Sequence, residues 1–288
     1  MTAAAALAGA AVVAAPAAAQ AQAAATVQIP CRTSALVTAI SNANSGPGTI
    51  IVLPGNCTYN ITTPATAADG LPVITGNVAL AGGHDTVIRR TAAAQFRIFE
   101  VASGGTLGLS SITIENGRAA ALGGGILNAG TVVMNHATLA GNTASSGGGM
   151  ANNAGATARI SNSNFVENTT TSVGGGAILN FGDLTVNGSI LARNTAPLNG
   201  GGINTQPGGV TRVNETTIAR NTSGGPGGGL SNLGTTSLNG STVVLNTGTS
   251  GGGIATGNSN VTLRGGTVVR NNTPDNCSPL NTIPGCVN

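Results

Sequence analysis

The 288-residue chain contains no lysine and no tryptophan, and it has only one tyrosine and four phenylalanines. Charged residues make up 7% of the sequence and aromatic residues 2%. A nucleic-acid surface needs clustered positive charge and aromatic rings on which bases stack, so these shortages argue against DNA or RNA as a partner. The net charge of +3 is too small to change that conclusion.

Acidic residues are scarce as well, and their spacing is poor for catalysis. The chain has eight: Asp69, Asp85, Glu100, Glu115, Glu167, Asp183, Glu215 and Asp275. No two are adjacent or two apart within a strand, whereas glycosidic acid–base chemistry needs carboxyl groups about 5–9.5 Å apart. No aspartate recurs at one repeat position, as a calcium-binding solenoid would require. The sequence therefore predicts no catalytic site and no metal site, and it indicates no cofactor.

Long helical patterns are missing too, and a glycine-rich repeat stands in their place. A triplet of small residues followed by an aliphatic residue or methionine occurs six times, beginning at Gly123, Gly147, Gly175, Gly200, Gly227 and Gly251. Each glycine inside a helix would cost roughly 1 kcal/mol relative to alanine. A repeat of this length is instead typical of a solenoid.

A recurrent asparagine marks the same repeat. It falls at Asn142, Asn168, Asn194, Asn221, Asn246 and Asn271, and apolar residues lie three and eight positions before each copy. We predict an all-β, right-handed parallel β-helix with three short strands per coil, successive coils lying about 4.8 Å apart. The asparagines then form a buried ladder, each amide bonding to backbone and to the next asparagine. This satisfies polar groups that would otherwise cost about 1–3 kcal/mol each.

The cysteines and the N-terminus both indicate export. Cys31 and Cys57 precede the repeats, and Cys277 and Cys286 follow them. Four cysteines allow three pairings, and nearness in sequence favours Cys31–Cys57 and Cys277–Cys286. Residues 3–19 form an apolar small-residue run like the core of a signal peptide, although no basic residue precedes it, and an unstructured alanine-rich tail is the alternative. The run is short and weakly apolar, so we expect no lasting membrane anchor.

We divide the chain into five parts. The export segment covers 1–25, and an N-terminal cap with the first strand covers 26–60. Within that cap, 34–44 place Leu36, Val37, Ile40 and Ala43 on one face, which predicts a short amphipathic capping helix. Irregular early coils follow over 61–116, regular coils over 117–272, and a C-terminal cap over 273–288.

Two groups of residues resemble known families. The stretch from Cys31 through Leu36, Ile40 and Leu53-Pro54 to Tyr59 resembles the N-terminal cap of secreted bacterial β-helix proteins of the pectin-lyase-like superfamily. The repeats also resemble the paired motifs of polymorphic outer-membrane adhesins, which occur here in strict form as 175–178 (GGAI) and 165–168 (FVEN). The resemblance implies a β-helix fold, but that superfamily includes both enzymes and non-enzymes.

A few polar side chains remain as site candidates. His84 and Asp85 are neighbours in a glycine-flanked turn, but adjacent residues on a strand point to opposite faces. His136 and Glu215 are expected in one column, three coils apart. A second column is expected to contain Glu115, Gly141, Glu167, Arg193, Arg220, Leu245 and Arg270. In it, Arg193, Arg220 and Arg270 are the candidate binding residues for an anion such as an acidic glycan.

The sequence thus favours a secreted, monomeric, non-catalytic scaffold or adhesin-like protein whose partner is an extracellular polysaccharide or a cell-surface component. The main alternative is a polysaccharide lyase or glycoside hydrolase with its site in the early coils, between Asp69 and Glu115. Ice binding through the single column of threonines that follow the asparagines is a third, less favoured hypothesis.

Overall fold

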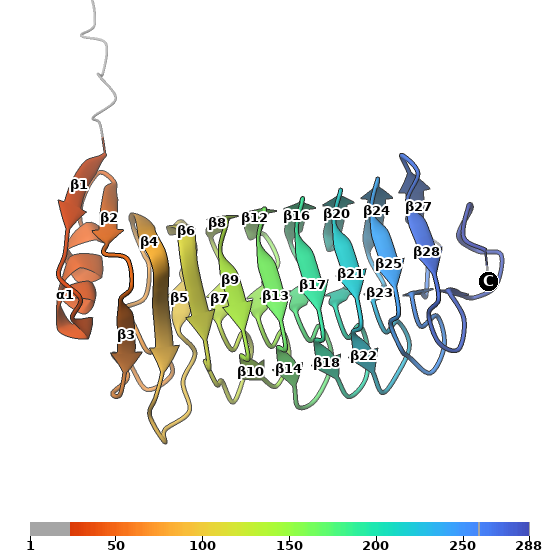
Figure 1. Cartoon of the computed structure of the whole chain (residues 1–288), viewed down its shortest axis with the longest axis horizontal. Helices are drawn as coiled ribbons and strands as arrows, with labels where there is room; N and C mark the ends of the chain where they lie inside the picture. The colour runs from red at the N-terminus through yellow and green to blue at the C-terminus, as the bar shows by residue number, and fades with distance from the viewer. Residues whose placement is uncertain (1–23, 259, 288) are drawn as a thin grey trace, which may run out of the picture.

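The chain forms an elongated parallel β-solenoid (Figure 1). The computed structural model describes residues 24–258 and 260–287. All of the predicted export segment except residues 24 and 25 lies outside the described residues. The predicted parallel β-helix is confirmed, since every strand pairing among the described residues is between parallel strands of successive turns.

Three parallel sheets run along the solenoid. The long sheet comprises β1 (Ala25–Gln28), β2 (Thr49–Leu53), β3 (Thr58–Ile61), β4 (Asn77–Arg90), β6 (Thr106–Glu115), β8 (Thr131–Asn135), β9 (Thr138–Ala140), β12 (Thr157–Ser161), β13 (Asn164–Val166), β16 (Asp183–Asn187), β17 (Ile190–Ala192), β20 (Val210–Asn214), β21 (Thr217–Ala219), β24 (Thr235–Asn239), β25 (Thr242–Val244), β27 (Val261–Arg264) and β28 (Val268–Arg270). The glycine-triplet sheet comprises β5 (Phe99–Val101), β7 (Ile126–Asn128), β11 (Met150–Asn152), β15 (Ile178–Asn180), β19 (Ile203–Thr205), β23 (Leu230–Asn232), β26 (Ile254–Thr256) and β29 (Cys277–Ser278). The short sheet comprises β10 (Thr143–Ala144), β14 (Thr169–Thr170), β18 (Thr195–Ala196) and β22 (Thr222–Ser223).

A regular coil therefore contains the three predicted strands and a two-residue fourth. In one coil these are β7, β8, β9 and β10. The glycines make the turn before β7-type strands possible: Gly147 has a φ of 64°, and a Cβ on Gly148 would lie 2.5 Å from the carbonyl oxygen of Thr169. Side chains cannot be accommodated where the backbones of successive coils approach so closely.

Aliphatic side chains fill the interior in columns. The column that follows the glycine triplets consists of Ile126, Met150, Ile178, Ile203, Leu230 and Ile254, and all six are fully buried. At the N-terminal end, α1 (Thr33–Ala43) covers the open coil with Leu36, Ile40 and Ala43, as predicted. The disulfides Cys31–Cys57 and Cys277–Cys286 are also confirmed, one at each end of the solenoid.

The predicted asparagine ladder is present as a continuous chain of hydrogen bonds. Nδ2 of each asparagine donates to Oδ1 of the next, with donor–acceptor distances of 2.9–3.0 Å from Asn142 to Asn272. The same oxygens accept the backbone N–H of the preceding asparagine. Each Nδ2 also donates to a backbone carbonyl, such as that of Phe165 for Asn194. Every polar atom of an interior rung is therefore paired.

The prediction that Asn271 forms the last rung of the ladder is wrong. Asn246 donates to Asn272, which is buried, whereas Asn271 is exposed and has a φ of 54°. The reason is a one-residue insertion: five positions separate Leu238 from Val243, but six separate Leu263 from Val269, their partners in the next coil. The apolar position three before the rung is therefore Val269, and the predicted Val268 faces outward.

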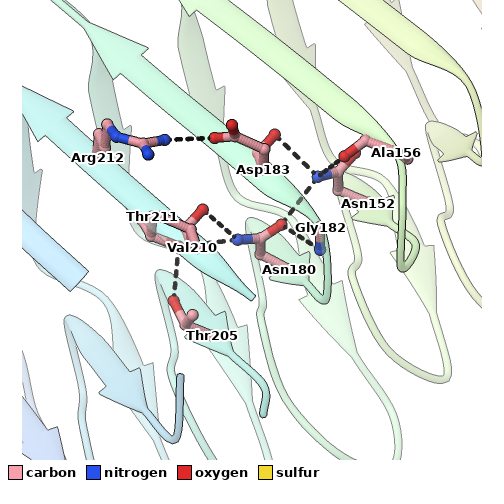
Figure 2. A network of polar contacts seen from close by, with 9 residues as sticks. All are labelled: Asn152, Ala156, Asn180, Gly182, Asp183, Thr205, Val210, Thr211 and Arg212. Atoms are coloured by element: carbon pink, nitrogen blue, oxygen red, sulfur yellow. Dashed lines mark hydrogen bonds and ion pairs between the residues drawn. The ribbon is translucent and has the colours of Figure 1, made fainter. Parts of the chain in front are cut away.

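Two further ladders run beside the first. Ser163, Ser189, Thr216, Ser241 and Thr267 each accept the backbone N–H one coil earlier through the side-chain hydroxyl. In the glycine-triplet sheet, Asn128 donates to Asn152 and Asn152 to Asn180. Figure 2 shows how this last ladder continues, with Asn180 donating to Thr211 at 3.0 Å and Thr211 in contact with Thr205 at 2.7 Å.

Candidate functional site

One corner of the solenoid carries a column of residues in the left-handed backbone conformation. We name it the arginine corner, and it consists of Asn116, Gly141, Glu167, Arg193, Arg220, Leu245 and Asn271, with φ between 54° and 60°. These residues follow the β9-type strands directly. The left-handed conformation bends the chain sharply, so side chains at this position project from an outer edge of the molecule.

The predicted positions of two residues in this column are wrong. Glu115 is the last residue of β6 and aligns with Ala140, and Arg270 is the last residue of β28 and aligns with Val244. Each lies one position before the corner. Glu115 and Glu167 therefore do not share a column. Glu115 instead approaches Arg89, with 3.6 Å between Oε1 and the guanidinium Nη1.

Of the three predicted binding residues, the structure brings two together. Arg193 and Arg220 occupy successive coils of the arginine corner, with φ values of 55° and 54°. Arg193 Nε donates to Glu167 Oε1 at 3.1 Å, and both side chains are more than half exposed. Arg220 makes no ion pair within residues 24–258 and 260–287. Arg270 is exposed on β28, outside the corner.

The arginine corner begins at a cleft on the outer surface. We name it the arginine cleft; it has a volume of about 570 Å³ and is lined by Arg90, Thr91, Ala92, Asn116, Gly117, Arg118, Gly141 and Thr143. Burial lowers the pKa of the Arg90 guanidinium, and the positive charge of Arg118 lowers it further. Both arginines come from the early coils or their boundary, where sequence reasoning placed no basic site.

Both histidines of the chain line a second cleft, of about 370 Å³. Asp85, Ser111 and His136 stack in successive coils with φ between 52° and 54°, and His84 lies beside them. His84 Nδ1 is 2.8 Å from Asp85 Oδ2, although both side chains are largely exposed. In the described structure Ser111 makes no hydrogen bond to an imidazole, so the pairing that activates a serine nucleophile is not formed. His136 shares its column with Glu215, as predicted, and they lie three coils apart.

A cluster of opposite charges is buried in the early coils. Arg97 Nη1 contacts Asp69 Oδ1 at 2.6 Å and Glu100 Oε2 at 2.8 Å. Thr66 donates to the second oxygen of Asp69 at 2.6 Å. Burial raises the pKa of Glu100, the adjacent Asp69 raises it further through its charge and a hydrogen bond, and Arg97 opposes the rise. One arginine therefore compensates two carboxyl groups.

Neither a metal-binding cluster nor a membrane-spanning helix is present among the described residues. No group of three or more histidine, cysteine, aspartate or glutamate side chains is arranged to hold a metal ion. Among the same residues, no helix is both long and apolar enough to cross a membrane.

Sequence reasoning missed the arginine cleft and the buried cluster for one reason. Arg90 and Arg118 are 28 residues apart, and so are Asp69 and Arg97, which is about one coil. That spacing was a usable signal. In the early coils, however, neither the glycine triplet nor the asparagine marks the register, so the alignment of successive turns could not be read.

Comparison with known proteins adds no relative. No family model, no curated protein and no solved structure matches this chain. The resemblance to pectin-lyase-like proteins and polymorphic outer-membrane repeats therefore rests on the motifs alone. What is established is the architecture, a parallel β-solenoid with a disulfide at each end.

Proposed function

We propose that this chain is a secreted, non-catalytic scaffold or adhesin-like protein that binds acidic polysaccharide along the arginine corner. The observation that carries the proposal is the adjacent pair Arg193 and Arg220, which repeat one side chain on successive coils in the same backbone conformation. Coils lie about 4.8 Å apart, so the corner offers a line of evenly spaced positions to an extended anionic chain.

The compartment is consistent with this proposal. All four cysteines are paired in disulfides, which indicates an oxidising environment of the extracellular type. Disulfides at both ends and buried ladders between them make a rigid rod, and a rigid surface loses little conformational freedom when it binds a polymer.

The test is a binding isotherm with polygalacturonate, using neutral dextran as the comparison polymer. The double variant Arg193→Gln plus Arg220→Gln should weaken binding by at least about tenfold. Arg264→Gln plus Arg270→Gln removes the same charge from exposed positions outside the corner and should have little effect. Binding by the wild type should also weaken as salt rises, because exposed charges are screened. Equal losses in the two double variants would contradict the proposal.

The alternative function is a polysaccharide lyase or glycoside hydrolase, and one observation favours it. Glu100 is half-buried and has a raised pKa, the property that a general acid needs near neutral pH. New reducing ends or unsaturated products from a panel of neutral and acidic polysaccharides, abolished by Glu100→Gln, would establish this activity. Asp85→Asn and Glu115→Gln test the other early-coil acids in the same assay.

A further inference from the structure

The arginine cleft is a fixed structure, because Arg90 is held from several sides. Its Nε donates to the carbonyl oxygen of Asn116 at 2.8 Å, and its Nη1 donates to the carbonyl oxygens of Ala92 and Ala94. The guanidinium carbon also lies 5.9 Å from the centre of the Phe96 ring. A guanidinium fixed in this way loses little freedom on binding a ligand with its remaining N–H groups.

The cleft has positive charge that no carboxylate neutralises. Arg118 is exposed and close enough to Arg90 to disfavour its charged form. Neither arginine makes an ion pair with any aspartate or glutamate in the part of the chain that the structure describes. The nearby Glu115 is directed to Arg89 instead. Two unneutralised cations beside one cleft favour a ligand that carries two negative charges.

We propose that the arginine cleft binds a phosphate monoester, whose dianion pairs with Arg90 and Arg118 together. A phosphoryl group carries a charge of about −1.5 to −2 at pH 7 and has three strong acceptor oxygens. Arg90 has protein partners on Nε and Nη1, so it would donate to the phosphate through Nη2, whereas the exposed Arg118 can offer paired N–H donors. A carboxylate carries one charge and would leave one of the two cations uncompensated.

The size and remaining lining indicate that the phosphate is attached to a larger molecule. The cleft, at about 570 Å³, lies within the range of about 300–1,000 Å³ that is typical of small-molecule sites. Beyond the arginines its side chains include the hydroxyls of Thr91 and Thr143 and the amide of Asn116. Hydroxyl and amide groups suit a polyhydroxylated body such as a sugar.

Gly141 keeps the cleft open, and the chain itself supplies a substitution that would close it. Gly141 has a φ of 60° and occupies the same corner column as Leu245, whose φ is 57°. Leucine is therefore compatible with this backbone position. A Cβ at Gly141 would lie 3.3 Å from Asn116 Oδ1, a tight contact that the exposed asparagine side chain can relieve. Gly141→Leu should fill the cleft without disturbing the coil.

The experiment is isothermal titration of the full chain with glucose 6-phosphate, inorganic phosphate, glucuronate and glucose. Glucose 6-phosphate should bind at least about tenfold more tightly than glucuronate, and glucose should not bind detectably. Tighter binding of glucose 6-phosphate than of inorganic phosphate assigns the cleft to a phosphorylated organic molecule, and equal binding assigns it to the free ion; both keep the dianion match. Equal binding of glucuronate and glucose 6-phosphate, or no heat with any phosphate at millimolar concentration, would overturn the proposal.

The variants localise the binding. Arg118→Gln should weaken phosphate binding by at least about tenfold, and Gly141→Leu should abolish it. Arg159→Gln is the matched control, since it removes an exposed arginine from the outer face of β12. A loss in Arg159→Gln as large as in Arg118→Gln would overturn the assignment. Arg118→Gln changes only an exposed side chain, so the test stands even if Gly141→Leu does not fold.

This site is independent of the proposed polysaccharide binding, although the cleft and the corner adjoin. The polymer test changes Arg193 and Arg220, whereas the phosphate test changes Arg118 and Gly141 and uses small ligands. Phosphate binding without polygalacturonate binding would leave the cleft intact and remove the proposed function. The reverse result would remove the cleft alone.

Discussion

The regular coils and the early coils differ in how their polar side chains are paired. From Asn142 to Asn272, side-chain amides and hydroxyls point inward, and they form hydrogen-bonded ladders that repeat from coil to coil. The early coils contain no such ladder. They contain instead a buried ion cluster of Asp69, Arg97 and Glu100, and both polar clefts lie along β4 and β6. Repetition therefore pairs the buried polar groups of the regular coils with one another, whereas the early coils bury an ion cluster and contribute Arg90, His84 and Asp85 to the two clefts.

The largest expected effect comes from breaking a ladder in its middle. Asn194→Ala leaves the backbone N–H of Asn168 without its acceptor, removes one of the two acceptors of Asn168 Nδ2, and takes the side-chain donor from the carbonyl of Phe165. Unpaired buried groups cost about 1–3 kcal/mol each, so the free energy of unfolding should fall by about 3–6 kcal/mol. Urea denaturation measures it.

A matched control tests the corrected register at the end of the same ladder. Asn271→Gly keeps the positive φ of an exposed residue and should change stability by less than about 0.5 kcal/mol. Asn272→Ala should be clearly destabilising. If the two substitutions had the same effect, the ladder would not pass through Asn272.

Breaking the buried cluster should have the next largest effect. Arg97→Met leaves Asp69, whose side chain is 6% exposed, without its counter-ion, and removal of one partner of a buried pair costs about 3–5 kcal/mol. Arg193→Met breaks an exposed pair with Glu167 and should cost less than about 1 kcal/mol. Parallel denaturation curves of the two variants measure the difference. Similar losses would show that the early coils do not depend on the cluster.

The pH dependence of Glu100 provides a smaller effect. Because its folded pKa is raised, the folded chain holds the proton more tightly than the unfolded chain does. That stability is present below the usual glutamate pKa and is lost as pH rises through the folded pKa. Glu100→Gln should therefore be as stable as the wild type in acid and more stable than it at neutral pH. Unfolding free energies between pH 4 and pH 7 test this, and a variant less stable at neutral pH would contradict it.

The smallest effect is expected from removing the inserted residue in the last coil. Deletion of Gly265 shortens the spacing between Leu263 and Val269 from six positions to five. Five is the spacing between their partners Leu238 and Val243 in the preceding coil. Shortening an exposed turn changes the closure entropy only slightly, so stability should stay within about 1 kcal/mol of the wild type. Loss of cooperative unfolding in this variant would mean that the insertion is needed for the C-terminal cap.

The repeat made most of the regular region predictable. Five rungs from Asn142 to Asn246, the interior aliphatic columns and both disulfides follow from residues that recur or flank the repeat. Asn271 fits the spacing of the repeat, and the rung moves to Asn272 only because one residue is inserted between Leu263 and Val269. The second ladder could have been found, since Asn128, Asn152 and Asn180 each lie two positions after the residue that follows a glycine triplet.

The candidate site was less predictable, for a physical reason. β4 and β6 pair with a register shift between Ala81 and Thr86, so residues that stack in the early coils are not separated by a constant number. Arg90 and Arg118 line one cleft from successive coils, and their side chains carry no motif that marks them. A prediction based on spacing alone finds columns only where the spacing is constant.

The hydrogen bonds between the asparagines of the ladder also run in one direction along the solenoid. In every bond between side-chain amides the donor lies on the N-terminal side and the acceptor on the C-terminal side. The series begins at Gly117, whose backbone N–H donates to Asn142, and it ends at Asn276, which accepts from Asn272. The hydroxyl ladder accepts in the same sense. Aligned amide dipoles polarise one another, whereas the dipoles of sheet backbones are small. The two ends of the rod are therefore not equivalent, and a partner bound along its length meets a scaffold with a defined direction.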